Sequence, residues 1–129
     1  MESHSNPGTL PDPIVVLSWP STTPLATVSD TFVTALRQPF DFVNVQRTKL
    51  RLVVSAKTSD PATATEVKLL VDGNDVVTLS TNSDVFVVLT SDAIDFPKLP
   101  AISFVEIQYR ITKAGPTASI EGAVVQLEV

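Results

Sequence analysis

The 129-residue sequence has no cysteine, one histidine and only four glycines. Without cysteine the chain has no disulfide, no thiolate metal ligand and no cysteine nucleophile. The single histidine, His4, lies between two serines and has no partner at the spacing of a catalytic dyad or triad. The sequence also has no phosphate-binding glycine loop and no nucleophile-elbow motif. We therefore predict that the chain is not an enzyme and has no catalytic residue and no cofactor.

Aromatic residues make up only 6% of the chain, and acidic residues outnumber basic ones by 14 to 9. Because nucleic-acid binding usually needs a basic face, we expect no nucleic-acid partner. No apolar run approaches the ~20 residues of a membrane-spanning helix, so we expect no membrane contact. The first residues lack the basic and apolar regions of a signal peptide, and we expect synthesis in a cytoplasm without one.

Valine, isoleucine and threonine are abundant, at 40 of 129 residues. Their branched side chains favour strands, and from residue 40 onward apolar and polar residues alternate in segments that recur about every ten residues. We predict an all-β fold, an antiparallel β-sandwich of seven or eight strands that is jelly-roll-like and preceded by an extended N-terminal arm. The residues expected to face its core are Leu50, Leu52, Val54, Ala56, Val67, Leu69, Val71, Val105, Ile107, Tyr109, Ile111, Val125, Leu127 and Val129.

Two local signals mark departures from regular strands. The run Asp72-Gly73-Asn74-Asp75 predicts a hairpin turn, because these residue types tolerate positive φ. Gly122 lies inside the last predicted strand and indicates a bulge there. The order of the strands cannot be read from periodicity, so an immunoglobulin-like arrangement stays open beside the jelly roll.

Residues 1–39 form a proline-rich arm in this prediction, and residues 40–129 form the sandwich. Six of the ten prolines fall in the arm, where they disfavour helices and central strands. The arm is nevertheless rich in apolar residues, so we predict a short strand or docking segment at 14–19 and a second short strand at 30–37, with a helical turn as second choice. The arm residues expected to bind a partner are Ile14, Val15, Val16, Leu17 and Trp19.

Charge is distributed unevenly along the predicted sandwich. Residues 37–68 carry a net charge of +3 and residues 69–109 a net charge of −5. Complementary faces of two subunits could meet through these charges, or the charges could lie opposite one another across strands of one domain. The charged interface candidates are Arg47, Lys49, Arg51, Asp72 and Asp75.

Carboxylates near the turns have three interpretations. They could bind Ca²⁺ through oxygen ligands, act as a glycosidase pair or shape turns and strand ends. The stretch that begins at Asp72 lacks the spacing of an EF-hand loop. We favour the turn interpretation and predict no metal site.

Trp19 and Tyr109 are the possible glycan contacts. Carbohydrate-binding modules stack sugars on exposed Trp or Tyr rings, and Trp19 precedes Pro20, which could expose its ring. Tyr109 lies on the apolar face of its strand and is predicted to be in the core. Alternatively, Trp19 anchors the arm on its own or a neighbouring domain, which we favour because tryptophan is a common contact anchor.

The region 40–129 resembles jelly-roll or carbohydrate-binding-module-like sandwiches of bacteriophage and viral structural proteins. The resemblance lies in strand rhythm and in the hairpin with the letters VDG, over the segments LRLVVSAKTSD, EVKLLVDGNDVVTLS, VEIQYRITKAG and GAVVQLEV. It implies a non-enzymatic structural protein of the virion, a decoration, cement or minor capsid protein. Such a protein would be a homo-oligomer that binds itself or a major capsid protein. The alternative is a carbohydrate-binding module, free-standing or on a phage fibre.

Overall fold

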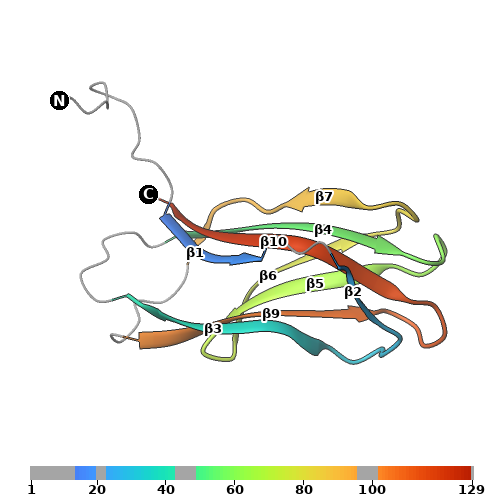
Figure 1. Cartoon of the computed structure of the whole chain (residues 1–129), viewed down its shortest axis with the longest axis horizontal. Coiled ribbons are helices and arrows are strands. Elements are labelled where there is room, and N and C mark those ends of the chain that lie inside the picture. Colours follow the sequence, from blue (N-terminus) through green and yellow to red (C-terminus); the bar gives the residue numbers. More distant parts are fainter. Residues whose placement is uncertain (1–13, 20–22, 43–48, 96–101, 129) are drawn as a thin grey trace, which may run out of the picture.

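The structure of the chain, a computed structural model, describes residues 14–19, 23–42, 49–95 and 102–128. These residues form ten strands and no helix, as Figure 1 shows. The strands are β1 (Ile14–Trp19), β2 (Leu25–Thr27), β3 (Val33–Asp41), β4 (Lys49–Thr58), β5 (Thr65–Val71), β6 (Asn74–Thr81), β7 (Val87–Thr90), β8 (Ile94–Asp95), β9 (Ile102–Ile111) and β10 (Ala118–Glu128).

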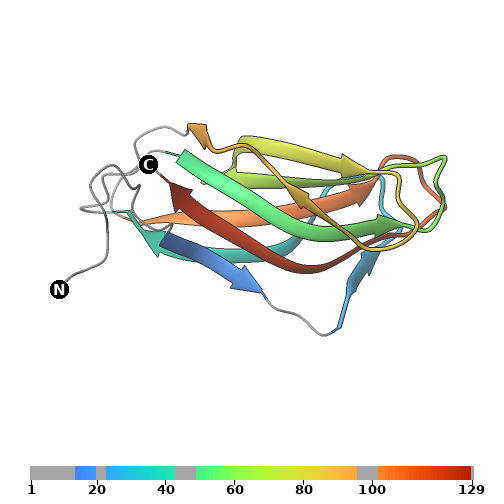
Figure 2. The same cartoon turned by 90° about the horizontal axis from the view of Figure 1, so that it is seen from above.

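The strands form two antiparallel sheets that pack face to face (Figures 1 and 2). Sheet A has the order β1-β10-β4-β7, with β2 also paired with β10 and β8 also paired with β4. Sheet B has the order β3-β9-β5-β6. Because β1 and β2 share one edge of sheet A and β7 and β8 the other, the ten segments occupy eight positions. The predicted fold class, an antiparallel jelly-roll-like β-sandwich, is confirmed.

The core lies between the two sheets and consists of the alternate apolar residues of their strands. Leu50, Leu52 and Val54 of β4 are buried, and β9 buries its own alternate residues in the same way. β5 alternates up to Leu69, and its last residues are all buried. The alternation read from the sequence therefore identified the core face of the central strands, because successive side chains of a strand point to opposite faces.

The described part of the predicted arm belongs to the sandwich. The strand predicted at 14–19 is β1, which pairs with β10 and carries Val16 and Leu17, 8% and 1% exposed, in the core. The boundary predicted between 39 and 40 falls within β3, which pairs with β9 along its whole length. Pro39 fits there because β3 is an edge strand, where proline is tolerated. Residues 1–13 lie outside the described residues.

Both predicted backbone signals are confirmed. Asp72 and Gly73 connect β5 to β6 as the two central residues of a hairpin turn, with φ of 49° and 81°, and two positive φ values are the mark of a type I′ turn. Gly122 has φ of 72°, and the pairing of β10 with β4 shifts between Glu121 and Ala123. A bulge therefore interrupts β10 halfway along sheet A.

Candidate functional site

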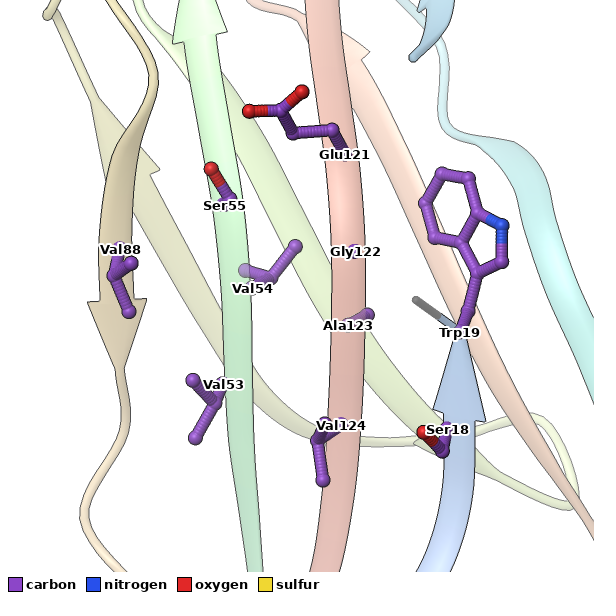
Figure 3. Close-up of a pocket in the computed structure, with 10 residues that line it drawn as sticks. All are labelled: Ser18, Trp19, Val53, Val54, Ser55, Val88, Glu121, Gly122, Ala123 and Val124. Carbon is purple, nitrogen blue, oxygen red and sulfur yellow. The ribbon is translucent and has the colours of Figure 1, made fainter. Parts of the chain in front are cut away.

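A shallow pocket of about 230 Å³ lies on the outer face of sheet A, the face turned away from sheet B (Figure 3). Every position of the sheet contributes to it, since the lining comes from β1, β10, β4 and β7. The lining residues are Ser18, Trp19, Val53, Val54, Ser55, Val88, Glu121, Gly122, Ala123 and Val124.

The strand register arranges the outward-facing residues of the pocket in two rows across the strands. In the first row Ser55 of β4 is opposite Val88 of β7 on one side and Glu121 of β10 on the other. In the second row Val124 is opposite Val53 on one side and Ser18 of β1 on the other. The pocket is therefore a transverse feature that crosses the strands.

Trp19 is the one tryptophan of the chain and ends β1 at the rim of the pocket. Its side chain is partly exposed and packs against the hydrophobic core. Viewed toward the outer face of sheet A, the indole is seen nearly face-on beside Gly122 (Figure 3). One face of the ring therefore covers the core, and the other is turned outward.

The bulge at Gly122 shapes the polar side of the pocket. A positive φ favours glycine, because a Cβ is strained in that conformation. Across the bulge, Glu121 is partly exposed while Ala123 is only 4% exposed and faces the core. Bulges re-aim side chains next to functional sites, and here the Glu121 carboxylate extends from β10 toward Ser55 of β4, on the side away from the indole (Figure 3).

Valines make the rest of the pocket apolar. Val88 on the edge strand β7 is 69% exposed, and Val53 and Val124 between it and β1 are partly exposed. A contiguous apolar surface with polar groups at its margin is typical of binding sites.

The predicted partner-binding and glycan-contact residues differ in solvent exposure. Ile14 and Val15 are exposed, whereas Val16 and Leu17 are buried and unavailable to a partner. Tyr109 of β9 is only 4% exposed, and its burial raises the pKa of the phenol. Because Tyr109 faces the core from sheet B, it does not join Trp19 on a common surface.

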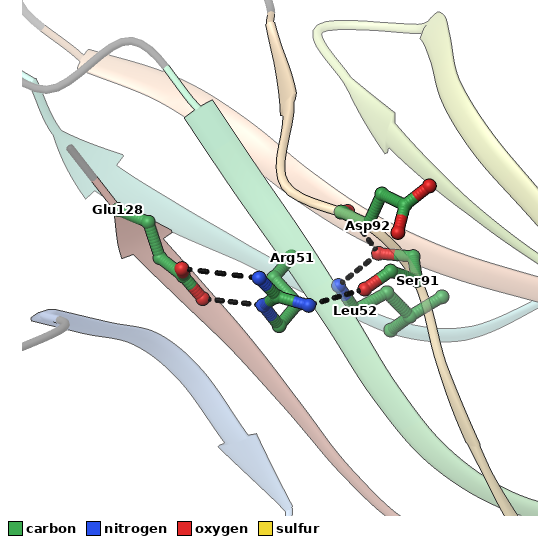
Figure 4. Close-up of polar contacts among 5 residues, drawn as sticks. All are labelled: Arg51, Leu52, Ser91, Asp92 and Glu128. Atoms are coloured by element: carbon green, nitrogen blue, oxygen red, sulfur yellow. Dashed lines mark hydrogen bonds and ion pairs between the residues drawn. The ribbon is translucent and has the colours of Figure 1, made fainter.

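Arg51, one of the basic interface candidates of β4, pairs with an acidic residue of the same domain (Figure 4). The Arg51 guanidinium donates to both carboxylate oxygens of Glu128, from Nε at 2.5 Å and from Nη2 at 3.3 Å, and its Nη1 donates to the Ser91 carbonyl at 2.7 Å. The hydrogen bond with Arg51 lowers the pKa of Glu128 and raises that of Arg51. Lys49 lies opposite Glu128 in the register.

The acidic interface candidates also have local partners. Asp72 accepts a hydrogen bond of 2.7 Å from the Phe104 backbone N–H, which lowers the pKa of its carboxyl. Asp75 forms an ion pair of 3.3 Å with Lys68. Arg47 lies outside the described residues. The contacts favour the interpretation in which these charges face one another within one domain.

The outer face of sheet B is covered by a network of polar and aromatic side chains. Arg110 forms an ion pair of 2.7 Å with Glu66 and lies 4.5 Å from the centroid of the Phe32 ring. Lys68 lies 4.2 Å from the same ring. Gln108 and Thr34 both donate hydrogen bonds to Glu106. Although partial burial opposes the shift, these bonds lower the pKa of Glu106.

Over the described residues, no group of three or more His, Cys, Asp or Glu side chains converges as a metal site would require. The same residues include no helix with the length and hydropathy of a membrane span. The pocket of sheet A contributes one carboxylate, that of Glu121, and does not fit a Ca²⁺ ion, which needs several oxygen ligands.

No protein-family model and no curated protein sequence matches the chain. Solved structures do match. The CBM36-1 domain of a multidomain xylanase from the hindgut metagenome of Trinervitermes trinervoides has a TM-score of 0.61 and 10% identity, over 88% of this chain and 96% of that chain. A carbohydrate-binding module CBM36 in complex with calcium and xylotriose has a TM-score of 0.58 and 13% identity, over 88% and 92%.

The insecticidal delta-endotoxin Cry8Ea1 of Bacillus thuringiensis is also similar, with a TM-score of 0.57 and 14% identity, over 82% of this chain and 19% of that chain. At these identities the comparisons establish the β-sandwich fold. The same fold occurs in carbohydrate-binding modules and in a part of a toxin, so the fold alone does not identify a function. Neither they nor the described contacts support the predicted role in a virion, and the capsid partner and homo-oligomer stay predictions.

Proposed function

We propose that this chain is a non-catalytic carbohydrate-binding module that contacts its glycan through the outer face of sheet A at Trp19. The observation that carries the proposal is the indole ring, which is turned outward beside Gly122 at the rim of a shallow pocket that Glu121 also lines. A sugar ring has an apolar C–H face and hydroxyl groups around its edge. It can therefore stack on the indole while its hydroxyls reach the polar groups of the rim.

The polar groups of the pocket suit hydroxyl recognition. The Glu121 carboxylate accepts hydrogen bonds, and the hydroxyls of Ser18 and Ser55 donate or accept them. Small-molecule sites typically combine an apolar lining with a few polar groups that fix the orientation of the ligand. The pocket has this composition.

The fold comparison supports the proposal through the length of chain that is matched as well as through the shared architecture. The CBM36-1 domain is matched over 96% of its length, so the similarity extends over nearly the whole of that domain. The second CBM36 structure was determined with xylotriose bound. A sandwich of this kind can therefore present a glycan site without further domains.

The test uses Trp19 as its own reporter. Because the chain has one tryptophan, stacking of a sugar on the indole should change the intensity and shift the maximum of the intrinsic fluorescence in a saturable way. The full chain is titrated with xylo-, cello- and manno-oligosaccharides, and binding is confirmed by calorimetry. If no saturable change and no heat of binding is found with any of these glycans, nor any hit on a glycan array, the proposal is rejected.

A further inference from the structure

We infer that the pocket binds the interior of a neutral linear polysaccharide, which crosses the strands of sheet A from Trp19 to Val88 and needs no calcium. The inference rests on the carbohydrate-binding function proposed above and names the class of glycan and its direction on the sheet.

The direction follows from the two rows of outward-facing residues. The pocket residues come from four neighbouring strand positions, β1, β10, β4 and β7. Neighbouring strands lie about 4.8 Å apart, so the three intervals from β1 to β7 span about 14 Å. A single sugar ring is shorter than that distance and can reach only one end of the pocket, whereas a short oligosaccharide can reach both.

The two ends offer an apolar contact each, with polar groups between them. Trp19 forms one end, Val88 forms the other, and the Glu121 carboxylate and the Ser55 hydroxyl lie between. A linear chain would stack one ring on the indole, pass its hydroxyls over the polar residues and cover the exposed valine with another ring. Burial of this valine adds a favourable hydrophobic contribution only for a chain long enough to reach it.

We infer that the pocket binds an internal stretch of the glycan because both ends of the pocket lie at edges of the sheet. Strands β1 and β7 are both at edges of sheet A in the described part of the chain. A polysaccharide that crosses the sheet can therefore continue past either edge, and its recognition does not depend on a free end.

The charges around the pocket favour a neutral chain. Glu121 is the one charged residue that lines the pocket, and a carboxylate repels uronate and sulfate groups. The nearest basic residues of β4 are engaged elsewhere in the domain. Arg51 is paired with Glu128, and the Lys57 ammonium lies 4.9 Å from the centroid of the Phe86 ring. A ligand that donates hydroxyl hydrogen bonds to Glu121 suits this surface best.

The experiment measures how affinity depends on chain length. Calorimetry on the full chain uses neutral xylo-, cello- and manno-oligosaccharides from mono- to hexasaccharide, with oligogalacturonates of matched length as anionic probes. For the neutral series that binds, we expect affinity to rise by about tenfold or more from the monosaccharide and to level off once the oligosaccharide spans the pocket. Oligogalacturonates should bind more weakly, and EDTA should leave the affinity unchanged.

Two matched variants locate the far end of the pocket. Val88→Asp places a charge at this end and should weaken binding of the longer oligosaccharides by about tenfold, while the affinity for the shortest ones stays the same. Val85→Asp is the control, because Val85 is 63% exposed and does not line the pocket. Circular dichroism and thermal melting establish that both variants fold.

The outcomes separate this inference from the function on which it rests. Four results would overturn the inference and leave the carbohydrate-binding function standing. These are glycan affinity that does not depend on chain length, loss of binding when the reducing end is blocked, stronger binding of oligogalacturonate, and loss of binding in EDTA. Absence of binding to every glycan overturns both. Light scattering could instead show concentration-dependent dimerisation that Val88→Asp abolishes, with no glycan binding. This result would assign the face to a contact between two copies of the chain, and it would overturn both the inference and the proposed function.

Discussion

The two outer faces of the sandwich differ in what covers their aromatic side chains. On sheet B the aromatic rings are covered by cations of neighbouring strands, with the Arg37 guanidinium 3.7 Å from the centroid of Phe104 and Lys68 and Arg110 both near Phe32. On sheet A the indole of Trp19 is turned outward, and no cation among the described residues lies over it.

The difference shows where a ligand can gain free energy. A ligand on sheet B would have to displace cation–π contacts, ion pairs and hydrogen bonds that already satisfy one another. A ligand on sheet A covers an indole and an exposed valine that form no cation–π contact or ion pair with the described residues, so it displaces fewer polar contacts of the protein. For this reason we assign binding to sheet A and solvent exposure to sheet B.

The largest expected effect contrasts the two aromatic positions. Trp19→Ala should weaken glycan binding by about tenfold or more, because it removes the only aromatic ring among the described residues that line the pocket and tryptophan is a common energetic anchor of contacts. Phe32→Ala, on the opposite face, should leave the affinity unchanged. Calorimetry with the same oligosaccharide measures both. If Phe32→Ala reduced the affinity as strongly as Trp19→Ala, the assignment of the two faces would be wrong.

A smaller effect is expected from the glycines with positive φ. Gly122→Ala on sheet A and Gly73→Ala at the β5–β6 turn should each lower the free energy of unfolding by about 1–2 kcal/mol, since the left-handed conformation is strained for alanine. Denaturant unfolding measures this loss. Only Gly122→Ala should also weaken glycan binding, because its bulge positions Glu121. Equal affinities of the two variants would contradict a role of the bulge in the site.

The network on sheet B should contribute modestly to stability and not to binding. Arg110→Gln removes both the ion pair with Glu66 and the cation–π contact with Phe32. Because these side chains are partly exposed, the free energy of unfolding should fall by only about 0.5–1 kcal/mol. Urea unfolding and calorimetry are measured on the same preparation. A loss of glycan affinity in this variant would place part of the site on sheet B.

The smallest expected effect is a change in pH dependence at the pair between Arg51 and Glu128. The folded-state pKa of Glu128 lies below its ordinary value of 4.5. The unfolded chain therefore binds the proton more readily, and the contribution to stability is present above pH 4.5 and lost as the pH falls through the lower folded-state pKa. Glu128→Gln should flatten this part of the profile of melting temperature against pH. An unchanged profile would show that the pair contributes nothing measurable.

Much of the fold was readable from local patterns. The alternation from Leu50 to Ala56 identified a core-facing strand, and Gly73 identified a hairpin, because side-chain period and φ preference are properties of short segments. The prolines of residues 1–39 indicated an arm, and the described part of these residues pairs into the two sheets as β1, β2 and most of β3. Pro39 is accommodated on an edge strand, and no local pattern tells an edge strand from an arm.

The site was only partly readable. Trp19 was chosen for its residue type, and Gly122 for its place in a strand. Glu121, Ser55 and Val88 were not predicted as site residues. The bulge predicted at Gly122 could have drawn attention to the adjacent Glu121, because bulges often occur next to functional sites. Val88 lies in the apolar run from Val85 to Leu89, which has no alternation to show that this valine is exposed.

The sequence by itself determined a cysteine-free β-sandwich, its core-facing residues, one hairpin and one bulge, because each depends on residues that are close together in the chain. Only the tertiary structure decided that Trp19, Ser55, Val88 and Glu121 share one surface. These residues are far apart in sequence, and the pairing of β10 with β1 and β4, together with that of β4 with β7, brings them to one face of the sheet. Strand order and register come from the packing of the whole domain, which no short segment encodes.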